Sequence, residues 1–198
     1  MTHYFSDNTD LPHKKIELNF DYEGIKFTFI SDIGVFSKNE IDQGSKILLD
    51  SVKDKNFKGN VLDLGCGYGV ISIILKKLFD IEATGVDVNP RAVSLSKENA
   101  IKNKVEINYF VSDGFSKVDS KFNEILVNPP IRAGKSVIYK MFNDAYDHLH
   151  ENGNLWVVIR KQQGASSAIA EITSIFKNCQ IIEKKKGYWI LKASRLDN

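Results

Sequence analysis

The chain has 198 residues, of which 42% are hydrophobic, and a formal net charge of +2 at pH 7. This length supports one core, so we expect a single domain over residues 1–198. A charge this small does not by itself identify a nucleic-acid partner. Its two cysteines, Cys66 and Cys179, lack the spacing of a zinc site or a disulfide framework, so we expect no metal.

Nothing in the apolar pattern indicates export or a membrane partner. The first residues, Met1–Asp10, are polar and acidic, unlike a signal peptide. The longest apolar runs, such as Val70–Leu75, are far too short to cross a bilayer. We therefore expect a cytoplasmic protein, either a monomer or a homodimer.

Near the start of the chain, apolar and polar residues alternate in two runs, Ile16–Phe20 and Ile25–Phe29. The intervening Asp21–Gly24 favours a turn, so the pattern predicts a β-hairpin. Its aromatic residues Phe27 and Phe29 either fill a core, which is the commoner role of alternating aromatics, or cover a cofactor or an RNA.

The segment after the hairpin has the pattern of a capping box. Ser37 is followed three residues later by Glu40, which predicts a helix that starts there. We expect this helix to continue through Ile47, Leu48 and Val52. The alternative for Ser37, together with the lysine after it, is to close over a bound cofactor.

From Asn60 onward, short apolar runs alternate with helical patterns, which is typical of parallel strands joined by crossover helices. The expected fold class is α/β: a Rossmann-like, mostly parallel sheet flanked by helices in residues 53–198, preceded by the hairpin and helix of residues 1–52. Gly187, between the last two strands, predicts an antiparallel C-terminal hairpin. The predicted strands are Asn60–Leu64, Ile81–Asp87, Val105–Val111, Glu124–Val127, Asn154–Ile159, Gln180–Lys184 and Tyr188–Lys192.

Capping residues mark two of the helices. Asn89 is a good N-cap and Pro90 suits the first helical position, so a helix should run from there through Asn99. A later helix from about Lys135 should close at a Glu-Asn-Gly sequence whose glycine, Gly153, supplies a left-handed stop.

The strongest local signal is Val61–Gly69, where an apolar strand passes through a glycine turn into a helix beginning near Val70. Glycines there let a ligand approach the backbone and bring N–H groups and the helix N-terminus toward it. The same glycines also suit a tight turn without a ligand. A dinucleotide-binding fingerprint would place its third glycine at position 70, which weakens the interpretation as a dehydrogenase.

Three aspartates accompany this turn. Asp87 ends the second core strand, where its carboxylate can accept hydrogen bonds from both hydroxyls of a ribose. Asp63 can attract a ligand ammonium group, whereas it would repel a pyrophosphate. Asp113 follows the third core strand. Since Asp87 and Asp113 lie at carboxyl ends of parallel strands, we expect them at one edge of the sheet, although each alone also suits a cap or a turn.

The sequence Asn128-Pro129-Pro130 follows the fourth core strand. The two prolines restrict the backbone and remove N–H donors, so the corner offers acceptors. The Asn128 side-chain oxygen and the Pro129 carbonyl can accept the two hydrogens of a planar amino group and aim its lone pair at an electrophilic carbon. Orientation would then dominate catalysis. A rigid loop ending a strand is the alternative interpretation.

The glycine turn matches the Asp-x-Gly-x-Gly-x-Gly motif of class I S-adenosylmethionine-dependent methyltransferases, which this chain resembles. The resemblance implies that S-adenosylmethionine is the cofactor, that the turn holds its methionine end, that Asp87 binds ribose and that Asp113 lies near the adenine amino group. The cofactor-binding residues implied are Asp63, Gly65, Cys66, Gly67, Gly69, Asp87, Val88, Asp113, Gly114 and Asn128.

The segment Asn128–Lys135 looks like the small-domain family related to the small-subunit ribosomal RNA guanine-N2 methyltransferase. The full-length bacterial enzyme carries an additional amino-terminal domain, which we do not expect within residues 1–198. Upstream, Gly34–Ser37 followed by Asp42, Gly44, Ser45 and Leu48 is similar to the same family. The resemblance implies methylation of a guanine N2 amine in ribosomal RNA. The catalytic residues would be Asn128, Pro129 and Pro130, and the partner would be ribosomal RNA or the small ribosomal subunit.

Substrate contacts are expected just after the prolines. Ile131 stands where adenine-N6 and glutamine methyltransferases usually have an aromatic residue, which favours guanine. Arg132 and Lys135 are candidate phosphate contacts, or else exposed loop charges. The lysine cluster Lys184–Lys186 is likewise either a phosphate-binding or a solvated surface.

Two alternative functions stay open. One is methylation of a protein glutamine or a small-molecule amine, and the other is a non-catalytic role in RNA binding or ribosome assembly.

Overall fold

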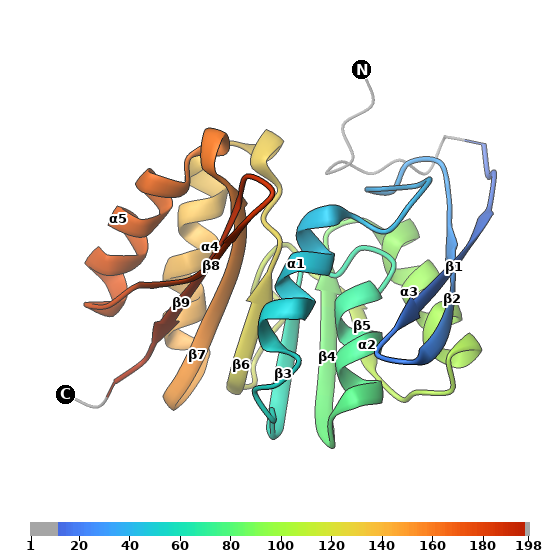
Figure 1. Ribbon diagram of the computed structural model, residues 1–198, viewed down its shortest axis with the longest axis horizontal. Coiled ribbons are helices and arrows are strands. Elements are labelled where there is room, and N and C mark those ends of the chain that lie inside the picture. The colour runs from blue at the N-terminus through green and yellow to red at the C-terminus, as the bar shows by residue number, and fades with distance from the viewer. Residues whose placement is uncertain (1–11, 197–198) are drawn as a thin grey trace.

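The computed structural model describes residues 12–196, so Met1–Asp10 lies outside the described residues. A large sheet carries helices on both faces, and a separate hairpin lies beside α3 (Pro90–Lys102), at the right of Figure 1. No helix in this part of the chain is long and apolar enough to cross a membrane.

The large sheet has seven strands, most of which lie close to the predicted ranges. In chain order they are β3 (Gly59–Leu64), β4 (Ile81–Asp87), β5 (Asn108–Val111), β6 (Phe122–Val127), β7 (Leu149–Arg160), β8 (Gln180–Lys185) and β9 (Tyr188–Ser194). Their order across the sheet is β5-β4-β3-β6-β7-β9-β8. The neighbouring pairs from β5 to β7 are parallel, whereas β9 runs antiparallel to both β7 and β8. The predicted fold class is therefore confirmed.

Two layers of helices bury the two faces of this sheet. Besides α3, the helices are α1 (Gln43–Val52), α2 (Val70–Leu78), α4 (Lys135–Asp147) and α5 (Ala165–Phe176). Alternate residues of β3 face opposite ways: Val61 packs with α1, α2 and α3, and Leu62 packs with α4 and α5. Because both faces are covered, consecutive apolar residues are buried in the strands at the centre of the sheet, as in Ile125–Val127 of β6 and Leu155–Ile159 of β7.

The N-terminal hairpin forms as predicted from β1 (Ile16–Tyr22) and β2 (Ile25–Ser31), which pair antiparallel. Phe27 and Phe29 are 1% and 0% exposed and belong to the same core cluster as α1, α2 and α3. The interpretation of these rings as core residues is confirmed. The alternative, in which they contact a cofactor or an RNA, is wrong.

The hairpin is attached to α3 through two asparagines that lie one helical turn apart. Asn99 donates to the Ile30 carbonyl at 2.9 Å and accepts from the Ile30 N–H at 2.6 Å. Asn103 makes the same pair of bonds with Thr28, at 2.8 and 3.1 Å. These amides satisfy the exposed backbone of an edge strand as a neighbouring strand would.

The first helix starts later than predicted. α1 begins at Gln43, and Asp42 is its N-cap, with Oδ2 accepting from the Ser45 N–H at 2.8 Å. Ser37 instead has a φ of 53° and donates its hydroxyl to the Glu40 carbonyl. The predicted capping box is wrong because Asp42 supplies a charged acceptor at the helix N-terminus, where a carboxylate is favoured.

The boundary between α4 and β7 also differs from the prediction. α4 ends at Asp147, and β7 begins at Leu149 rather than near Asn154. The Glu-Asn-Gly sequence lies within a register irregularity between β6 and β7, where Asn152, with a φ of 61°, is the left-handed residue. Gly153 is therefore not a helix stop.

The other capping predictions hold. Asn89 caps α3 by accepting from the Arg91 N–H at 3.0 Å, and Pro90 is the first helical residue. β5 starts at Asn108 rather than Val105, because the Val105 N–H donates to the Ala100 carbonyl and completes the end of α3.

Candidate active site

A cavity of about 870 Å³ opens at the carboxyl ends of the parallel strands. β3 and β6 lie side by side at its centre, where the strand order reverses, and open α/β sheets bind ligands at this point. All predicted site residues except Asp63, Gly69 and Lys135 line the cavity. Those that line it are Gly65, Cys66, Gly67, Asp87, Val88, Asp113, Gly114, Asn128, Pro129, Pro130, Ile131 and Arg132.

We call the part of the cavity formed by the loops after β3, β4 and β5 the glycine half. A Cβ atom added at Gly65 or Gly67 would meet no atom within 4 Å, so these residues leave open space above the loop. Gly69 is different, because a Cβ there would lie 2.7 Å from the Tyr109 hydroxyl. With a φ of 91°, Gly69 serves the start of α2 and its close packing on β5.

The backbone donors of the glycine loop are used within the protein. The N–H groups of Gly65 and Cys66 donate to the Val86 carbonyl at 2.8 and 2.9 Å. The Gly67 N–H donates to Asp87 Oδ2 at 2.9 Å. The prediction that this loop turns its N–H groups toward a ligand is wrong for these three residues, because the end of β4 supplies nearer acceptors. A loop of this kind is poorly suited to a pyrophosphate.

Asp87 lies at the end of β4 and lines the cavity. Its Oδ1 accepts from the Asn89 N–H at 2.8 Å, and burial raises the pKa of its carboxyl group. Each carboxylate oxygen can accept more than one hydrogen bond, so Asp87 retains capacity for a ligand hydroxyl. Asp113 is exposed beside it on the loop after β5.

Asp63 lies beneath the glycine loop rather than in the cavity. Its Oδ2 accepts from the Ser72 N–H at 3.0 Å and from the Ser72 hydroxyl at 2.8 Å, at the first turn of α2. Burial raises the pKa of Asp63 to about 6. A direct contact between Asp63 and a ligand ammonium group stays a prediction.

We call the part formed by the loops after β6 and β7 and the N-terminus of α1 the proline half. Asn128 is half-buried there, and its Nδ2 donates to Asp42 Oδ2 at 2.8 Å and to Ser45 Oγ at 3.1 Å. Pro129 is buried, and Pro130 leads into a short 3-10 helix, η1 (Ile131–Ala133). The local sequence around Asn128 carries no signal for contacts with residues 86 and 83 positions earlier.

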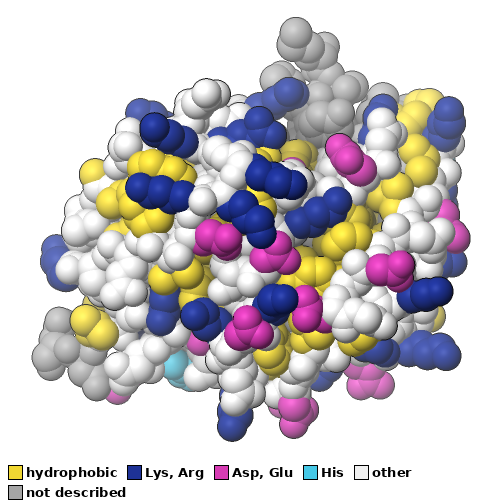
Figure 2. Space-filling view, in the orientation of Figure 1, with side chains coloured by type: hydrophobic (Ala, Val, Ile, Leu, Met, Phe, Trp, Pro, Cys, Tyr) yellow, Lys and Arg dark blue, Asp and Glu magenta, His cyan; other side chains and the backbone are white. Residues whose placement is uncertain are grey.

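Sequence patterns also missed Arg160 and Tyr188, which line the proline half. Arg160 donates from Nε to the Tyr188 hydroxyl at 2.8 Å, and its guanidinium lies 4.7 Å from the centre of that ring. The next residue, Lys161, donates its N–H to the Gly187 carbonyl, which places the lysine-rich β8–β9 turn beside the cavity. Figure 2 views the face of the molecule that carries α1, and over its middle Lys and Arg side chains are mixed with acidic ones.

The sequence profile of the methyltransferase small domain family matches residues 26–192. The chain belongs to this family. YbxB of Bacillus subtilis (strain 168) is 45% identical over 198 residues, which are 98% of each protein. The ribosomal RNA small subunit methyltransferase C of Vibrio cholerae is 31% identical over 180 residues, which are 88% of this chain and 52% of that protein. This small domain thus spans about half the length of the named methyltransferase.

Solved structures with this fold include larger methyltransferases. The T. thermophilus 16S rRNA N2 G1207 methyltransferase, in complex with AdoMet and guanosine, superposes with a TM-score of 0.85 at 24% identity, over 93% of this chain and 52% of that one. A methyltransferase from Pyrococcus furiosus superposes with a TM-score of 0.71 at 18% identity, over 83% of this chain and 91% of that one. These structures confirm the fold, and the profile match and the Vibrio cholerae relative confirm the resemblance to small-domain methyltransferases.

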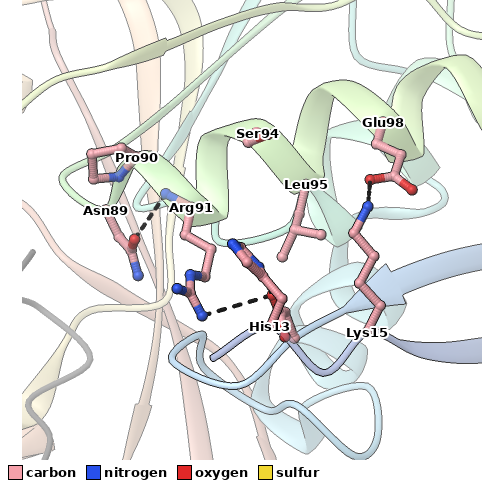
Figure 3. A pocket seen from close by; sticks show the side chains of 9 residues that line it. His13, Lys15, Asn89, Pro90, Arg91, Ser94, Leu95 and Glu98 are labelled. Carbon is pink, nitrogen blue, oxygen red and sulfur yellow. Dashed lines mark hydrogen bonds and ion pairs between the residues drawn. The ribbon is translucent and has the colours of Figure 1, made fainter. Parts of the chain in front are cut away.

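A second, smaller cavity of about 260 Å³ lies between α3 and the residues around β1 of this methyltransferase small domain (Figure 3). Its charged groups bind one another. His13 and Arg91 lie 2.6 and 3.7 Å from the buried Asp32 carboxylate, and Lys15 lies 2.6 Å from Glu98. These pairs attach the segment before β1 to α3, and none of the predicted site residues lines this cavity.

Proposed function

We propose that this methyltransferase small domain uses S-adenosylmethionine to methylate the exocyclic N2 amine of a guanine in ribosomal RNA. The observation that carries the proposal is that the glycine loop and the Asn-Pro-Pro corner line one cavity. A methyl donor held by the first and an amine held by the second would then meet. Loops at opposite ends of the sheet would not allow this.

The glycine half fits S-adenosylmethionine better than a dinucleotide. Gly65 and Gly67 leave room for the methionine end, Asp87 offers acceptors to ribose hydroxyls and Asp113 offers one to the adenine amino group. Carboxylates favour a cationic ligand without phosphates, and the loop's own N–H groups are already used. When bound, S-adenosylmethionine supplies an electrophilic methyl group.

In the proline half, Asn128 and Pro129 hold the acceptor amine. The Asn128 NH₂ group donates to Asp42 and Ser45, so its side-chain oxygen is the polar atom that it offers to a substrate. This oxygen and the Pro129 carbonyl accept the two hydrogens of the amino group and fix its orientation. The methylated amine then releases its extra proton to water, so the reaction needs no strong base beforehand.

The surface around this corner suits an RNA substrate. A target base must be unpaired or flipped out to reach Asn128, with Ile131 beside it. Arg132 and Arg160 line the cavity, and Lys161 and Lys186 are exposed next to it, so we propose these cations as contacts for the phosphates that flank the base. Lys135 begins α4 just outside the cavity and is proposed as a further phosphate contact. The name of the Vibrio cholerae relative supports ribosomal RNA as the substrate.

Methyl transfer to separated substrate fractions tests this function. The purified protein is incubated with methyl-labelled S-adenosylmethionine and with ribosomal RNA, small ribosomal subunits, ribosomal proteins or small amines, and labelled RNA is digested and analysed by mass spectrometry. We expect N2-methylguanosine, lost in Asn128→Ala. Label in proteins or small amines would favour the alternative enzymes. Cofactor binding with transfer to no fraction would favour the non-catalytic role.

A further inference from the structure

The amide of Asn128 is the one polar side chain of the Asn-Pro-Pro corner, and its chemistry depends on which end faces the substrate. The NH₂ end donates hydrogen bonds and the oxygen end accepts them. A rotation of the amide by half a turn would present a donor to the substrate amine, which is itself a donor. The corner therefore needs a partner that distinguishes the two ends.

Asp42 can make this distinction because an ionised carboxylate only accepts hydrogen bonds. With the NH₂ end toward α1, Asn128 Nδ2 lies 2.8 Å from Asp42 Oδ2. With the amide rotated, two oxygens would meet, and a half-buried carboxylate facing an acceptor is strongly disfavoured. Ser45 adds a second acceptor, since its Oγ lies 3.1 Å from the same Nδ2.

Asp42 is itself held rigidly at the N-terminus of α1. Its Oδ2 also accepts from the Ser45 N–H at 2.8 Å and lies 3.3 Å from the Ser45 hydroxyl. A Cβ at Gly44 would lie 2.9 Å from this oxygen and 3.0 Å from Tyr188 Cε1, so glycine allows the close approach of the helix start. The following turn is fixed by Ile47, which is 0% exposed.

We propose that Asp42 and Ser45 are positioning residues, which act through Asn128 by keeping its side-chain oxygen directed at the substrate amine. This inference rests on the proposed function, because it assumes that Asn128 holds an amine that is methylated. The contact joins two functions in one carboxylate. Asp42 starts the helix that precedes the sheet and orients the residue that follows β6.

Asp42→Ser separates these two functions, because serine is also a good N-cap but accepts and donates equally well. We expect the melting temperature and the Kd for S-adenosylmethionine to stay close to those of the wild type, and kcat on ribosomal RNA to fall about tenfold. In an Asn128→Ala background, the same change should lower kcat by less than twofold, since the group it orients is gone. Asp54→Ser, at an exposed position after α1, is the matched control.

An exchange of the two groups gives a second measurement. Asn128→Asp alone places two carboxylates together and should lower kcat at least a hundredfold. Adding Asp42→Asn lets an NH₂ group donate to the carboxylate at position 128, although that group then no longer accepts from the Ser45 N–H. This variant should recover kcat at least tenfold, because the side chain at position 128 is again held against α1 instead of being repelled from it. A contribution to folding alone would not produce this rescue.

The contact can also be tested without any substrate, by NMR of the Asn128 side-chain amide, whose signals are assigned by their loss in Asn128→Ala. We expect two dispersed, slowly exchanging proton signals that shift in Asp42→Ser. Signals of a freely rotating, solvated amide would overturn the inference. So would a normal kcat in Asp42→Ser, or an equal loss in the Asn128→Ala background. Failure of the proposed function is a separate result: guanine in ribosomal RNA would then receive no methyl group, whereas the NMR signals would still show whether Asp42 holds the Asn128 amide.

Discussion

The two halves of the cavity are assembled from different kinds of contact. In the glycine half, the carboxylate of Asp87 holds the Gly67 N–H, and the two residues lie 20 positions apart on consecutive strand ends. In the proline half, Asn128 is held by Asp42, 86 positions away on the helix that precedes the sheet. The first half is therefore built from the sheet itself, and the second depends on an added element.

This difference suggests a division of roles. Open space over the glycine loop and accepting carboxylates provide a place for a ligand, so changes there should alter affinity. A side-chain amide held at one end provides a direction, so changes in the proline half should alter turnover. A variant in the glycine half that alters only turnover, or one in the proline half that alters only affinity, would contradict this division.

The largest expected effect is that of Asn128→Ala. Removal of the accepting oxygen should lower kcat by about 10²- to 10³-fold, which is typical for the loss of one oriented polar group in an active site. The Kd for S-adenosylmethionine should change by less than about twofold, as measured by calorimetry. Asn39→Ala, in the exposed loop before α1, is the control. A large change in Kd with unchanged kcat would reverse the roles of the two halves.

The next effect concerns stability and pH. Burial raises the pKa of Asp63 from 3.8 to about 6, so the folded state binds more protons than the unfolded state between these values. Stability from this group therefore falls as the pH rises from about 4 to about 6 and stays lower above that range. Asp63→Asn, which keeps an acceptor for Ser72, removes this dependence.

The unfolding free energy of Asp63→Asn relative to the wild type should thus increase by on the order of 2–3 kcal/mol between pH 4 and pH 7. Urea unfolding at several pH values measures this difference. Asp80→Asn, at an exposed position, should show no such trend. A difference in unfolding free energy that does not change with pH would mean that the pKa of Asp63, beneath the glycine loop, is not raised.

Much of the glycine half could be predicted from the sequence because its geometry follows from topology. Once Val61–Gly69 is identified as a parallel strand followed by a turn, the end of each neighbouring strand must lie at the same edge. Asp87 and Asp113 therefore line one cavity, and the same rule brings Asn128 of the proline half to it. The cap at Asn89 could also be predicted, because its side chain bonds the N–H of Arg91, only two residues later in the chain.

The details that failed depend on contacts across the fold. The direction of the Gly67 N–H is set by the carboxylate at the end of β4, not by the glycine pattern. The predicted start of α1 at Ser37 is wrong because Asp42 caps the helix, and this cap comes with a contact to Asn128 from the other end of the fold. Likewise, the pairing of Asn99 with β2 has no local signal.

A smaller effect is expected in the glycine half from Asp87→Asn. The amide keeps one accepting oxygen, so one hydroxyl contact is lost together with the acceptor of either the Gly67 or the Asn89 N–H, and the Kd for S-adenosylmethionine should rise about tenfold to thirtyfold. At saturating cofactor, kcat should stay within about threefold of the wild type. Asp119→Asn, which is exposed, provides the control. An equal loss of kcat would show that the two halves are not separable.

The smallest effect concerns the RNA at the rim of the proline half. Lys161 and Lys186 are exposed there, on segments joined by the Lys161 N–H and the Gly187 carbonyl. The double variant Lys161→Ala/Lys186→Ala should weaken RNA binding about threefold to fivefold at moderate salt, with kcat unchanged. If both lysines contact phosphates, the slope of log K against log salt should become shallower by about 1.4, or roughly 0.7 for each single-strand contact.

The control for these lysines is Lys55→Ala/Lys58→Ala, which removes the same charge before β3, at the opposite edge of the sheet. Affinity alone does not distinguish local phosphate contacts from a general loss of positive charge, but the comparison of the two slopes does. Equal slopes in both double variants would indicate a long-range effect of net charge. A shallower slope only for the rim variant would support the proposed path of the RNA backbone beside the Asn-Pro-Pro corner.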